Sequence, residues 1–417
     1  MERLVDNMKN HKENEVAIRR SFLGNMLLVL GCLIFVLLGV LGCESALDFN
    51  STPEPISDYT TTENEHDHTD MPTPEYAPDY ITIAGEQFST DLTELDLWGR
   101  NLTDSDIEPL RYMVNLETLR LWNNLISDIS VLSYLSNLSD LSLNHNQISD
   151  IGVLAGLTNL TGIMLNNNQI NDISILSNLT NLTHLHLADN PISDISVLAH
   201  LPNLVFVTLR SDNINAINVL SDLANLTHLS IGGSQVYDIE VLSGLTNLEW
   251  LMITDAQVND ITALSNLTNL EWLMITSTQV SDITALRGLV NLTTLWLSYN
   301  EINDISALNE LENLGFLCLE GNYVSDISAL YELKNLEILR LCNNQISDIS
   351  MLSDMPILFN LSLAGNQISD ISTLSNLTSL TRLNLEDNPL TEEQVDYLRI
   401  ALPNCDISWG YENISVN

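Results

Sequence analysis

The sequence predicts an α/β solenoid, with a parallel sheet on its concave side and 3₁₀ or irregular segments on its convex side. The first observation is a leucine that recurs every 22 residues from Leu116 to Leu380. A fixed period of this size is typical of a chain that folds as a stack of short, similar units. The second is that the leucines within each copy alternate with other residues, as a strand with one buried face requires. The thirteen recurring positions are Leu116, Leu138, Leu160, Leu182, Leu204, Leu226, Leu248, Leu270, Leu292, Leu314, Leu336, Leu358 and Leu380.

One copy, residues 116–135, shows how the predicted unit is built. Leu119 and Leu121 alternate, so both side chains point to one side of a short strand and contribute to the core. Stacking the copies pairs each strand with the next, which gives the parallel sheet. The first half of the copy reads LxxLxLxxN, the leucine-rich repeat pattern, and the predicted fold is therefore a right-handed leucine-rich repeat horseshoe.

An asparagine occupies the ninth position of most copies. We expect its amide to lie inside the solenoid and to satisfy backbone groups left unpaired where the chain turns away from the strand. These residues are Asn124, Asn146, Asn168, Asn190, Asn300, Asn322, Asn344, Asn366 and Asn388. Four consecutive copies depart from the pattern, so we expect altered turns or curvature there. Their ninth residues are Asp212, Ser234, Ala256 and Thr278.

The second half of each copy, such as residues 126–132, is too short for a full helix and predicts a 3₁₀ or single-turn segment. An aspartate stands just before most of these segments. Its carboxylate can accept turn N–H groups as an N-cap, and a calcium-binding ladder is the alternative. Because the dense oxygen-ligand spacing of calcium loops is absent, we predict no metal site and no cofactor. The aspartates are Asp128, Asp150, Asp172, Asp194, Asp238, Asp260, Asp282, Asp304, Asp326, Asp348 and Asp370.

The repeat, with its motif Asn-x-Ile-Ser-Asp-Ile, resembles the 22-residue class found in bacterial internalins and related surface proteins. It is also similar to intracellular phosphatase-regulating repeat proteins of the same period. The resemblance covers roughly residues 92–405. For an internalin-like protein it implies recognition of other proteins on the concave face. It does not identify the partner, because one fold hosts many partners.

Both ends of the repeat array differ from its middle. Residues 80–115 predict an N-terminal cap with an atypical first copy, in which Asp104 opens a helical turn that helps to cover the core. Residues 116–390 form the repeats. Residues 391–417 predict a C-terminal cap, whose helix follows Thr391 and has an acidic first turn.

Residues 1–43 predict a signal or membrane-anchor segment. Lysines and arginines precede an apolar stretch from Phe22 to Gly42, which is long enough to span a bilayer. Positive charge before the stretch and acidic residues after it place the repeats on the extracytoplasmic face of the cell membrane. Residues 44–79 follow, with serine, threonine, proline and acids, and predict a disordered acidic tether.

The apolar stretch ends at Cys43, in a sequence that resembles a bacterial lipobox. That resemblance implies cleavage before Cys43 and attachment of lipid to it, so that the protein would be a lipoprotein. An uncleaved single-pass anchor is a second interpretation, and a twin-arginine export signal at Arg19 and Arg20 is a third.

The charge balance is strongly acidic. The chain has 14 lysines and arginines against 55 aspartates and glutamates, a formal net charge of −41. Such a surface repels nucleic acid and anionic lipid headgroups, so we predict no nucleic-acid partner. It suits cationic partners or divalent counter-ions, but we prefer the interpretation that the charge keeps the protein soluble outside a cell through self-repulsion.

The five cysteines form no evident disulfide framework. Cys318 and Cys342 fall on adjacent predicted strands, but they are offset by two residues, which places their Cα atoms roughly 8 Å apart and beyond disulfide reach. We therefore expect free thiols there. We expect Cys405 to be buried in the C-terminal cap.

The outward strand positions become apolar in the middle copies. Trp250 and Trp272 should be neighbours about 4.8 Å apart, with Met252 and Met274 beside them. Since the leucines already fill the core, we expect a solvent-facing patch, which usually marks a binding surface. Cross-strand packing without a ligand is the alternative. The candidate ligand-binding residues are Phe206, Trp250, Met252, Trp272, Met274, Trp296, Tyr299 and Phe316.

Three histidines, His184, His186 and His228, cluster near the edge of this patch, and we interpret them as a polar rim. A metal site would need a further ligand at a matched distance. The chain contains no HExxH, no G-x-S-x-G, no P-loop and no Rossmann glycine pattern, so we do not expect an enzyme.

These observations predict a membrane-tethered, extracytoplasmic protein that binds a protein or peptide ligand through the concave patch. Glycan or cell-wall binding is an alternative, because tryptophan faces also stack on sugar rings. A passive structural spacer is another alternative, and it would tolerate loss of the tryptophans.

Overall fold

The computed structural model describes residues 78–410 except residue 215. All described residues belong to one compact unit of the chain. The account that follows therefore concerns the repeat array and its two caps.

The predicted anchor segment 1–43, with Cys43, lies outside the described residues, as do residues 44–77 of the predicted tether and residues 411–417. In the part of the chain that the structure describes, no helix is both long enough and apolar enough to cross a membrane.

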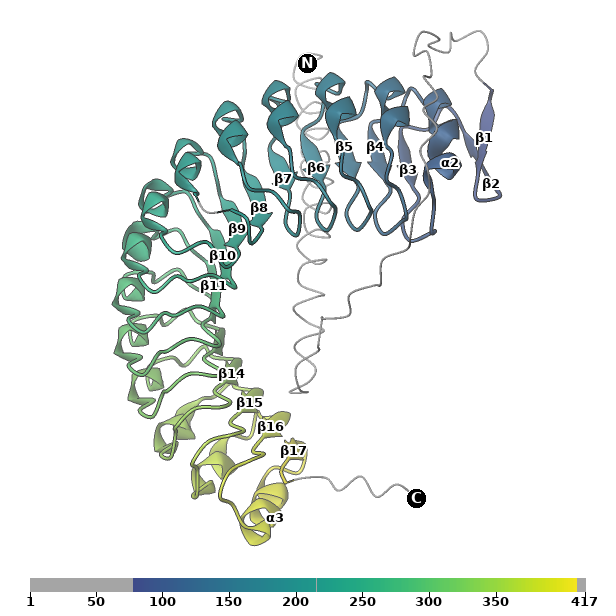
Figure 1. Ribbon diagram of the computed structural model, residues 1–417. Coiled ribbons are helices and arrows are strands. Elements are labelled where there is room, and N and C mark those ends of the chain that lie inside the picture. Colours follow the sequence, from purple (N-terminus) through teal and green to yellow (C-terminus); the bar gives the residue numbers. More distant parts are fainter. Residues whose placement is uncertain (1–77, 215, 411–417) are drawn as a thin grey trace, which may run out of the picture. The chain divides into compact units, whose positions relative to one another are not determined.

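A parallel sheet of 15 strands runs through the array from β3 (Glu94–Asp96) to β17 (Asp406–Ser408), and consecutive strands are neighbours. Figure 1 shows the strands along the inner side of the curved array and the short helices along its outer side. This arrangement confirms the predicted solenoid. The strands between the two ends are β4 (Thr118–Arg120), β5 (Asp140–Ser142), β6 (Gly162–Met164), β7 (His184–His186), β8 (Phe206–Arg210), β9 (His228–Gly232), β10 (Trp250–Thr254), β11 (Trp272–Thr276), β12 (Thr294–Trp296), β13 (Phe316–Cys318), β14 (Ile338–Arg340), β15 (Asn360–Ser362) and β16 (Arg382–Asn384).

The second half of each copy forms a short 3₁₀ helix, as predicted. In η3, for example, the buried Leu135 follows the last helical residue, and its N–H donates to the carbonyl of Leu132. These helices are η3 (Ser130–Tyr134), η4 (Gly152–Gly156), η5 (Ser174–Asn178), η6 (Ser196–His200), η7 (Asn218–Asp222), η8 (Glu240–Gly244), η9 (Thr262–Asn266), η10 (Thr284–Leu286), η11 (Ser306–Leu308), η12 (Ser328–Leu330), η13 (Ser350–Asp354) and η14 (Ser372–Asn376).

The leucines that define the period fill the core. All thirteen recurring leucines are buried, and so are Leu119 and Leu121 of the first regular copy. Burying a leucine side chain contributes roughly 2 kcal/mol, so the stack of copies is stabilised mainly by this continuous column.

The ninth-position asparagines connect each copy to its neighbours. The Nδ2 of Asn168 donates to the carbonyl of Leu165 in its own copy and to that of Leu143 in the preceding copy, both at 3.0 Å. Its Oδ1 accepts from the N–H of Ile148 at 3.0 Å. These bonds satisfy backbone groups where the strands end, which confirms the predicted role of the asparagine.

The sheet changes in the copies that lack the asparagine. The strands β8 to β11 have five residues each, whereas the flanking strands β7 and β12 have three. Without the amide, the carbonyls at the strand ends remain available to the neighbouring backbone, and the ladder continues, for example to the pair Arg210 and Gly232. The turn changes too: Asp189 and Asp255 are left-handed, with φ of 60° and 53°, but Ser211 at the same repeat position is not. The predicted local alteration is therefore confirmed.

The aspartates before the 3₁₀ helices bind backbone N–H groups, but not as N-caps. The Oδ1 of Asp128 accepts from the N–H of Ser130 at 2.8 Å, whereas the N-cap residue of η3 is Ile129. The same contact, from an aspartate to the N–H two residues later, recurs at all eleven aspartates. The prediction that these carboxylates accept turn N–H groups is confirmed. Each aspartate stands one residue before the N-cap, however, and forms an Asx turn.

The N-terminal cap contains a hairpin that the sequence analysis missed. β1 (Tyr80–Ile83) pairs antiparallel with β2 (Glu86–Ser89). Ala84 and Gly85 between them both have positive φ, at 49° and 83°, as a two-residue turn of this kind requires. The alternation Tyr-Ile-Thr-Ile followed by Ala-Gly was the signal that could have found it. The next elements are α2 (Asp104–Ile107) and η2 (Glu108–Tyr112), which confirm the predicted helical turn.

The C-terminal cap contains the predicted helix, α3 (Glu392–Ala401), and one further strand, β17, which was not predicted. The helix starts with a capping box: the Thr391 hydroxyl accepts from the N–H of Gln394 at 3.4 Å, and the Gln394 Oε1 accepts from the N–H of Thr391 at 2.9 Å. Cys405 is half-buried, so the expectation that it is buried was wrong; β17 follows it at once and leaves it at the rim of the cap.

Candidate ligand-binding surface

The aromatic residues of the middle copies lie side by side on the sheet. Trp250 of β10 pairs in register with Trp272 of β11, and Met252 pairs with Met274. Between the outward residues, Leu251 points into the core and is fully buried. We call the following set the aromatic band: Phe206, Trp250, Met252, Trp272, Met274, Trp296 and Phe316.

The rings of the band stack on one another. The centroids of Trp250 and Trp272 are 4.4 Å apart with planes at 11°. The Phe206 ring lies 6.3 Å from that of Trp250, and Trp296 and Phe316 form a second stack at 4.3 Å. Each such pair contributes about 1 kcal/mol beyond the area it buries, so the band stiffens the sheet in addition to forming an apolar surface.

The band is less exposed than the sequence analysis predicted. Trp250, Trp272 and Phe316 are half-buried, and Met274 is only 8% exposed. The reason lies in the register: Met274 stands between Met252 and Trp296, and Trp250 and Trp272 each cover one flat face of the other. The half-buried rings thus leave only part of their surface accessible to a ligand.

Tyr299 stands apart from the band. It occupies the turn after β12, with φ of 55°, and its side chain is 55% exposed. Its hydroxyl donates to the Oε1 of Glu320 at 2.7 Å, and its ring lies over Gly321. The structure therefore does not bring this candidate residue together with the others.

The three histidines divide into two environments. His186 is buried against Phe206, with ring centroids 4.7 Å apart, and burial lowers its pKa to about 3. His184 and His228 are half-buried at the edge of the band, and burial lowers their pKa values as well. All three are therefore neutral at pH 7. The interpretation as a polar rim fits His184 and His228 and was wrong for His186, which lies beneath Phe206.

Asp140 and His184 face each other across Gly162, at one end of the band. The three residues hold the same register position on β5, β6 and β7. A Cβ at Gly162 would lie 3.2 Å from the Oδ2 of Asp140 and 3.9 Å from the Cβ of His184. Burial raises the pKa of Asp140, and nearby Arg120 and His184 oppose that rise. A glycine here thus lets a carboxyl group and an imidazole approach each other.

An acidic hollow of about 480 Å³ opens at the carboxyl ends of the strands next to the band. Arg210 crosses it: its Nε and Nη2 donate to the two carboxylate oxygens of Asp189, each at 2.8 Å. Its Nη1 lies 3.6 Å from the Oδ2 of Asp255. The hydrogen bonds that Arg210 donates to Asp189, and after them the charges of the nearby carboxylates, raise the pKa of Arg210, while burial opposes the rise. The hollow is lined by Asp189, Asn190, Pro191, Arg210, Ser211, Asp212, Asn213, Gly233 and Asp255.

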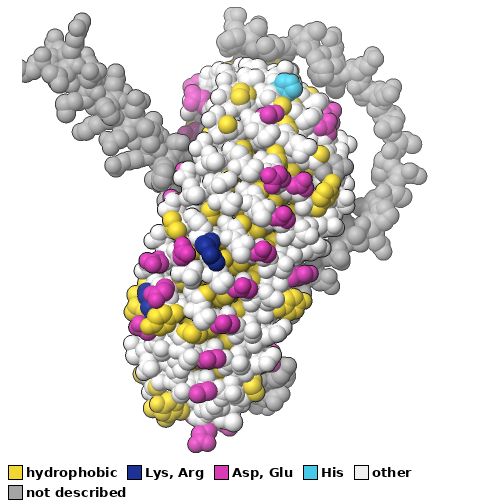
Figure 2. All heavy atoms as spheres, turned by 90° about the vertical axis from the view of Figure 1, so that its left-hand side faces the viewer, with side chains coloured by type: hydrophobic (Ala, Val, Ile, Leu, Met, Phe, Trp, Pro, Cys, Tyr) yellow, Lys and Arg dark blue, Asp and Glu magenta, His cyan; other side chains and the backbone are white. Residues whose placement is uncertain are grey.

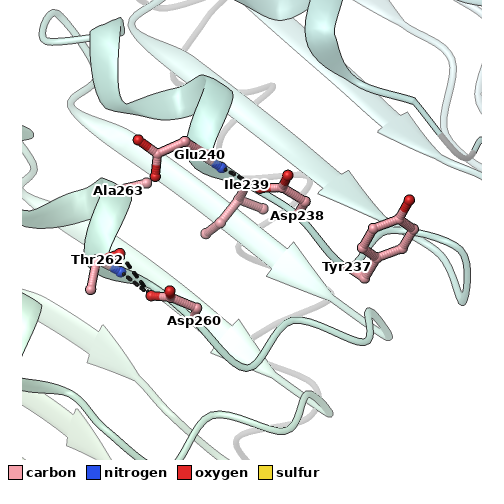
Figure 3. A pocket seen from close by; sticks show the side chains of 7 residues that line it. All are labelled: Tyr237, Asp238, Ile239, Glu240, Asp260, Thr262 and Ala263. Carbon is pink, nitrogen blue, oxygen red and sulfur yellow. Dashed lines mark hydrogen bonds between the residues drawn. The ribbon is translucent and has the colours of Figure 1, made fainter.

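The outer face carries acidic side chains along its length with few basic ones, as Figure 2 shows. A smaller hollow of about 230 Å³ lies on this side beside Tyr237. In Figure 3 the carboxylates of Asp238 and Asp260 point at the N–H groups of Glu240 and Thr262, each at 2.9 Å. Since both carboxylates accept hydrogen bonds from backbone N–H groups, we assign this hollow to the structural aspartate turns and not to a ligand site. Among the described residues, no three His, Cys, Asp or Glu side chains are placed to hold a metal ion.

A second aromatic stack, absent from the sequence analysis, lies in the first two copies. Trp98 and Trp122 stack with centroids 4.7 Å apart and planes at 6°, and Trp98 is 53% exposed. Both occupy the seventh position of their copies, so reading that position across copies would have found them. Cys318 and Cys342 carry thiols, as expected; both are buried, and each Sγ lies within hydrogen-bond distance of a serine hydroxyl.

Comparison with known protein families assigns the repeats. A model described as "Leucine Rich repeats (2 copies)" matches residues 114–156, 136–178, 180–223, 268–312 and 312–354. A second model, "Leucine rich repeat", matches residues 334–390. No curated protein sequence matches the chain.

Solved structures share the fold. An internalin from Listeria monocytogenes is 34% identical, with a TM-score of 0.65 over 72% of this chain and 89% of that one. A leucine-rich repeat protein from Leptospira interrogans is 23% identical, with a TM-score of 0.67 over 76% of this chain and 90% of that one. A plant peptide hormone receptor, solved in complex with RGF2, is 20% identical, with a TM-score of 0.55 over 72% of this chain and 56% of that one. The chain therefore belongs to the leucine-rich repeat proteins, and among them it is similar to a bacterial internalin.

Proposed function

We propose that the chain is a membrane-tethered, extracytoplasmic binding protein that recognises a protein or peptide ligand through the aromatic band. The observation that carries the proposal is that the band is additional to a complete core. The leucine column is already fully buried, so the tryptophans are not needed to fill the interior. Tryptophan is enriched at interface hot spots, and a contiguous apolar surface on a soluble domain usually marks a contact site.

The fold supports binding in preference to catalysis. The concave sheet presents an extended surface instead of a deep cavity, and the hollow at the carboxyl ends of its strands is open and acidic. The plant peptide hormone receptor of similar fold was solved in complex with RGF2, so the architecture is compatible with ligand capture.

A protein ligand is favoured over a glycan because the two central tryptophans each use one flat face to cover the other. Sugar rings stack on open tryptophan faces, but Trp250 and Trp272 cover each other. A peptide can instead pack apolar side chains against the ring edges.

The attachment to the membrane rests on the N-terminal sequence. The apolar stretch from Phe22 to Gly42 followed by Cys43 is suited to a lipid anchor. Labelling of growing cells with a palmitate analogue tests it: the wild type should incorporate label and Cys43→Ala should not. Equal labelling of both proteins would exclude lipid at this cysteine.

The binding proposal is tested by comparing the full-length chain with the variant Trp250→Ala/Trp272→Ala/Trp296→Ala in pull-downs from extracellular material. The variant Trp98→Ala/Trp122→Ala is the matched control, because it also removes a tryptophan stack but from another part of the array. We expect a protein retained by the wild type and the control and lost from the band variant. Equal retention by all three, with circular dichroism showing that each is folded, would exclude the band as the binding surface.

A further inference from the structure

We propose that the ligand segment bound by the aromatic band is basic, and that it sets lysine or arginine side chains beside apolar ones. This inference rests on the proposed function and names the chemistry of its partner. Its basis is the distribution of charge around the band, which is negative on both edges.

The first edge lies at the amino ends of β10 and β11. Glu249 and Glu271 are exposed and directly precede Trp250 and Trp272. The two glutamates are neighbours across the sheet, because the N–H of Glu271 donates to the carbonyl of Glu249 at 2.9 Å. In the described part of the chain, neither carboxylate has a lysine or arginine partner. Two like charges on adjacent strands destabilise a sheet slightly unless a cation lies between them.

The second edge lies at the carboxyl ends of the same group of strands, in the acidic hollow. Three carboxylates, those of Asp189, Asp212 and Asp255, face a single guanidinium there. Arg210 donates two hydrogen bonds to Asp189, whereas its Nη1 is 3.6 Å from the Oδ2 of Asp255, which is a looser contact. The hollow therefore already accepts one guanidinium and keeps an excess of negative charge beside it.

The floor between the two edges has almost no positive charge of its own. Arg210 is the only lysine or arginine in the strands β7 to β13, and the flanking histidines have lowered pKa values. A basic segment would be attracted to both edges, and its cations could lie against the tryptophan rings. The net charge of −41 would steer such a segment toward the chain, whereas an acidic one would be repelled.

The dimensions fit a short extended segment. The strand β10 runs from Trp250 to Thr254, roughly 13 Å at the usual rise of a strand, and Asp255 follows it in the turn. An extended peptide of similar length could place an apolar side chain on the band and a basic one at the hollow. Capture would then need both features in one segment.

The test uses a library of random short peptides displayed on phage, selected on the full-length chain held in mild detergent. Selected peptides are synthesised, and their affinities are measured by fluorescence anisotropy for four proteins. These are the wild type, Trp250→Ala/Trp272→Ala, Glu249→Gln/Glu271→Gln and the control Glu310→Gln/Glu312→Gln. The control removes the same charge from two exposed glutamates between η11 and β13, neither of which adjoins a strand.

We expect selected peptides to be enriched in lysine or arginine next to aromatic or aliphatic residues. The tryptophan variant should abolish their binding. The Glu249/Glu271 variant should weaken it about tenfold, chiefly through slower association, and the control should weaken it less than twofold. Asp212→Asn/Asp255→Asn should also weaken peptide binding, because it removes two negative charges from the hollow. The variant should still fold, because the amide oxygen of Asn at position 212 can accept from the N–H of Ser234.

Three outcomes would overturn the inference, and they differ in what else they overturn. Neutral or acidic peptides that depend on the tryptophans would contradict the basic partner and leave the proposed function intact. Basic peptides weakened equally by the control would show general attraction to an acidic protein. Peptides indifferent to the tryptophans would contradict the proposed function as well.

Discussion

Trp250 and Trp272 stack with ring centroids 4.4 Å apart because the strands that carry them pair residue for residue. The stack therefore depends on the 22-residue offset between copies, and a slip of one residue would turn one indole into the core. The indole pair can thus serve as a spectroscopic probe of the register between copies.

Replacing Trp272 with phenylalanine should remove the exciton couplet that two close indoles produce in circular dichroism. Stacking and packing area are largely kept, so thermal unfolding should change little. Trp296→Phe is the control, since Trp296 stacks on Phe316 and not on an indole. Because Trp98 and Trp122 produce a couplet of their own, the difference spectrum is the measurement. An unchanged spectrum in Trp272→Phe would contradict the stacked geometry.

Asn344→Ala should destabilise the array by about 2 kcal/mol or more. The Nδ2 of Asn344 donates to the carbonyls of Leu319 and Leu341 at 2.9 and 3.2 Å, and buried groups left unpaired are costly. The control is Asn335→Ala, because its single bond, to the carbonyl of Glu312, is exposed. Urea unfolding of both variants measures the difference, and equal midpoints would argue against a structural role for the ninth-position amide.

Gly233→Ala should destabilise the array strongly, by about 2 kcal/mol or more. Gly233 has φ of +119°, and an added Cβ would come 2.2 Å from the carbonyl oxygen of Ser211, which is backbone and cannot move aside cheaply. Gly244→Ala is the matched control, since nothing lies within 4 Å of its Cβ position and it ends a 3₁₀ helix. Thermal denaturation should show a lower Tm for the first variant alone.

Stability should fall as pH decreases from 6.5 toward 3, in part because of His186. Its pKa is lowered from 6.5 to about 3 by burial, so in this window the unfolded chain binds a proton that the folded chain does not. The stabilisation present above pH 6.5 is therefore lost progressively below it, at about 1 kcal/mol per pH unit. Asp140, whose pKa is raised, acts in the opposite direction at acidic pH.

The comparison of wild type with His186→Phe isolates this contribution, because other groups titrate in both proteins. The difference in unfolding free energy should be constant above pH 6.5 and should shift in favour of the variant below it. A difference independent of pH would show that His186 does not titrate differently on folding.

Much of the fold could be predicted because the same residue pattern recurs in every copy of the repeat. The buried leucines, the 3₁₀ segments and the asparagine bonds follow from one copy and are then multiplied. The hairpin β1–β2 and the strand β17 could not be read in this way, since each occurs once and lacks a period. The shift of Asp128 from N-cap to Asx turn was missed because the two positions differ by one residue and use the same chemistry.

The candidate site was harder to predict than the scaffold. The row of Trp250 and Trp272 could be found from register alone, but the burial of Met274 depends on side chains from two other strands. Tyr299 was included because it is near in sequence, although the turn after β12 carries it off the strand face. The hollow around Arg210 needed the conformation of Ser211, which no pattern in the sequence specifies.

The interruption of the asparagine ladder has a consequence for how this protein can change over generations. In the outer copies, neighbouring units are joined by a side-chain amide, so the ninth position is constrained. In β8 to β11 the longer main-chain ladder joins them instead, and main-chain bonds are available to any residue but proline. Position nine is there free to be aspartate, serine, alanine or threonine, as Asp212, Ser234 and Ala256 illustrate. The ninth position of these four copies is thus where substitution is tolerated best, and the four copies include those of Phe206, Trp250 and Trp272, so residues beside the aromatic band could change there without loss of the scaffold.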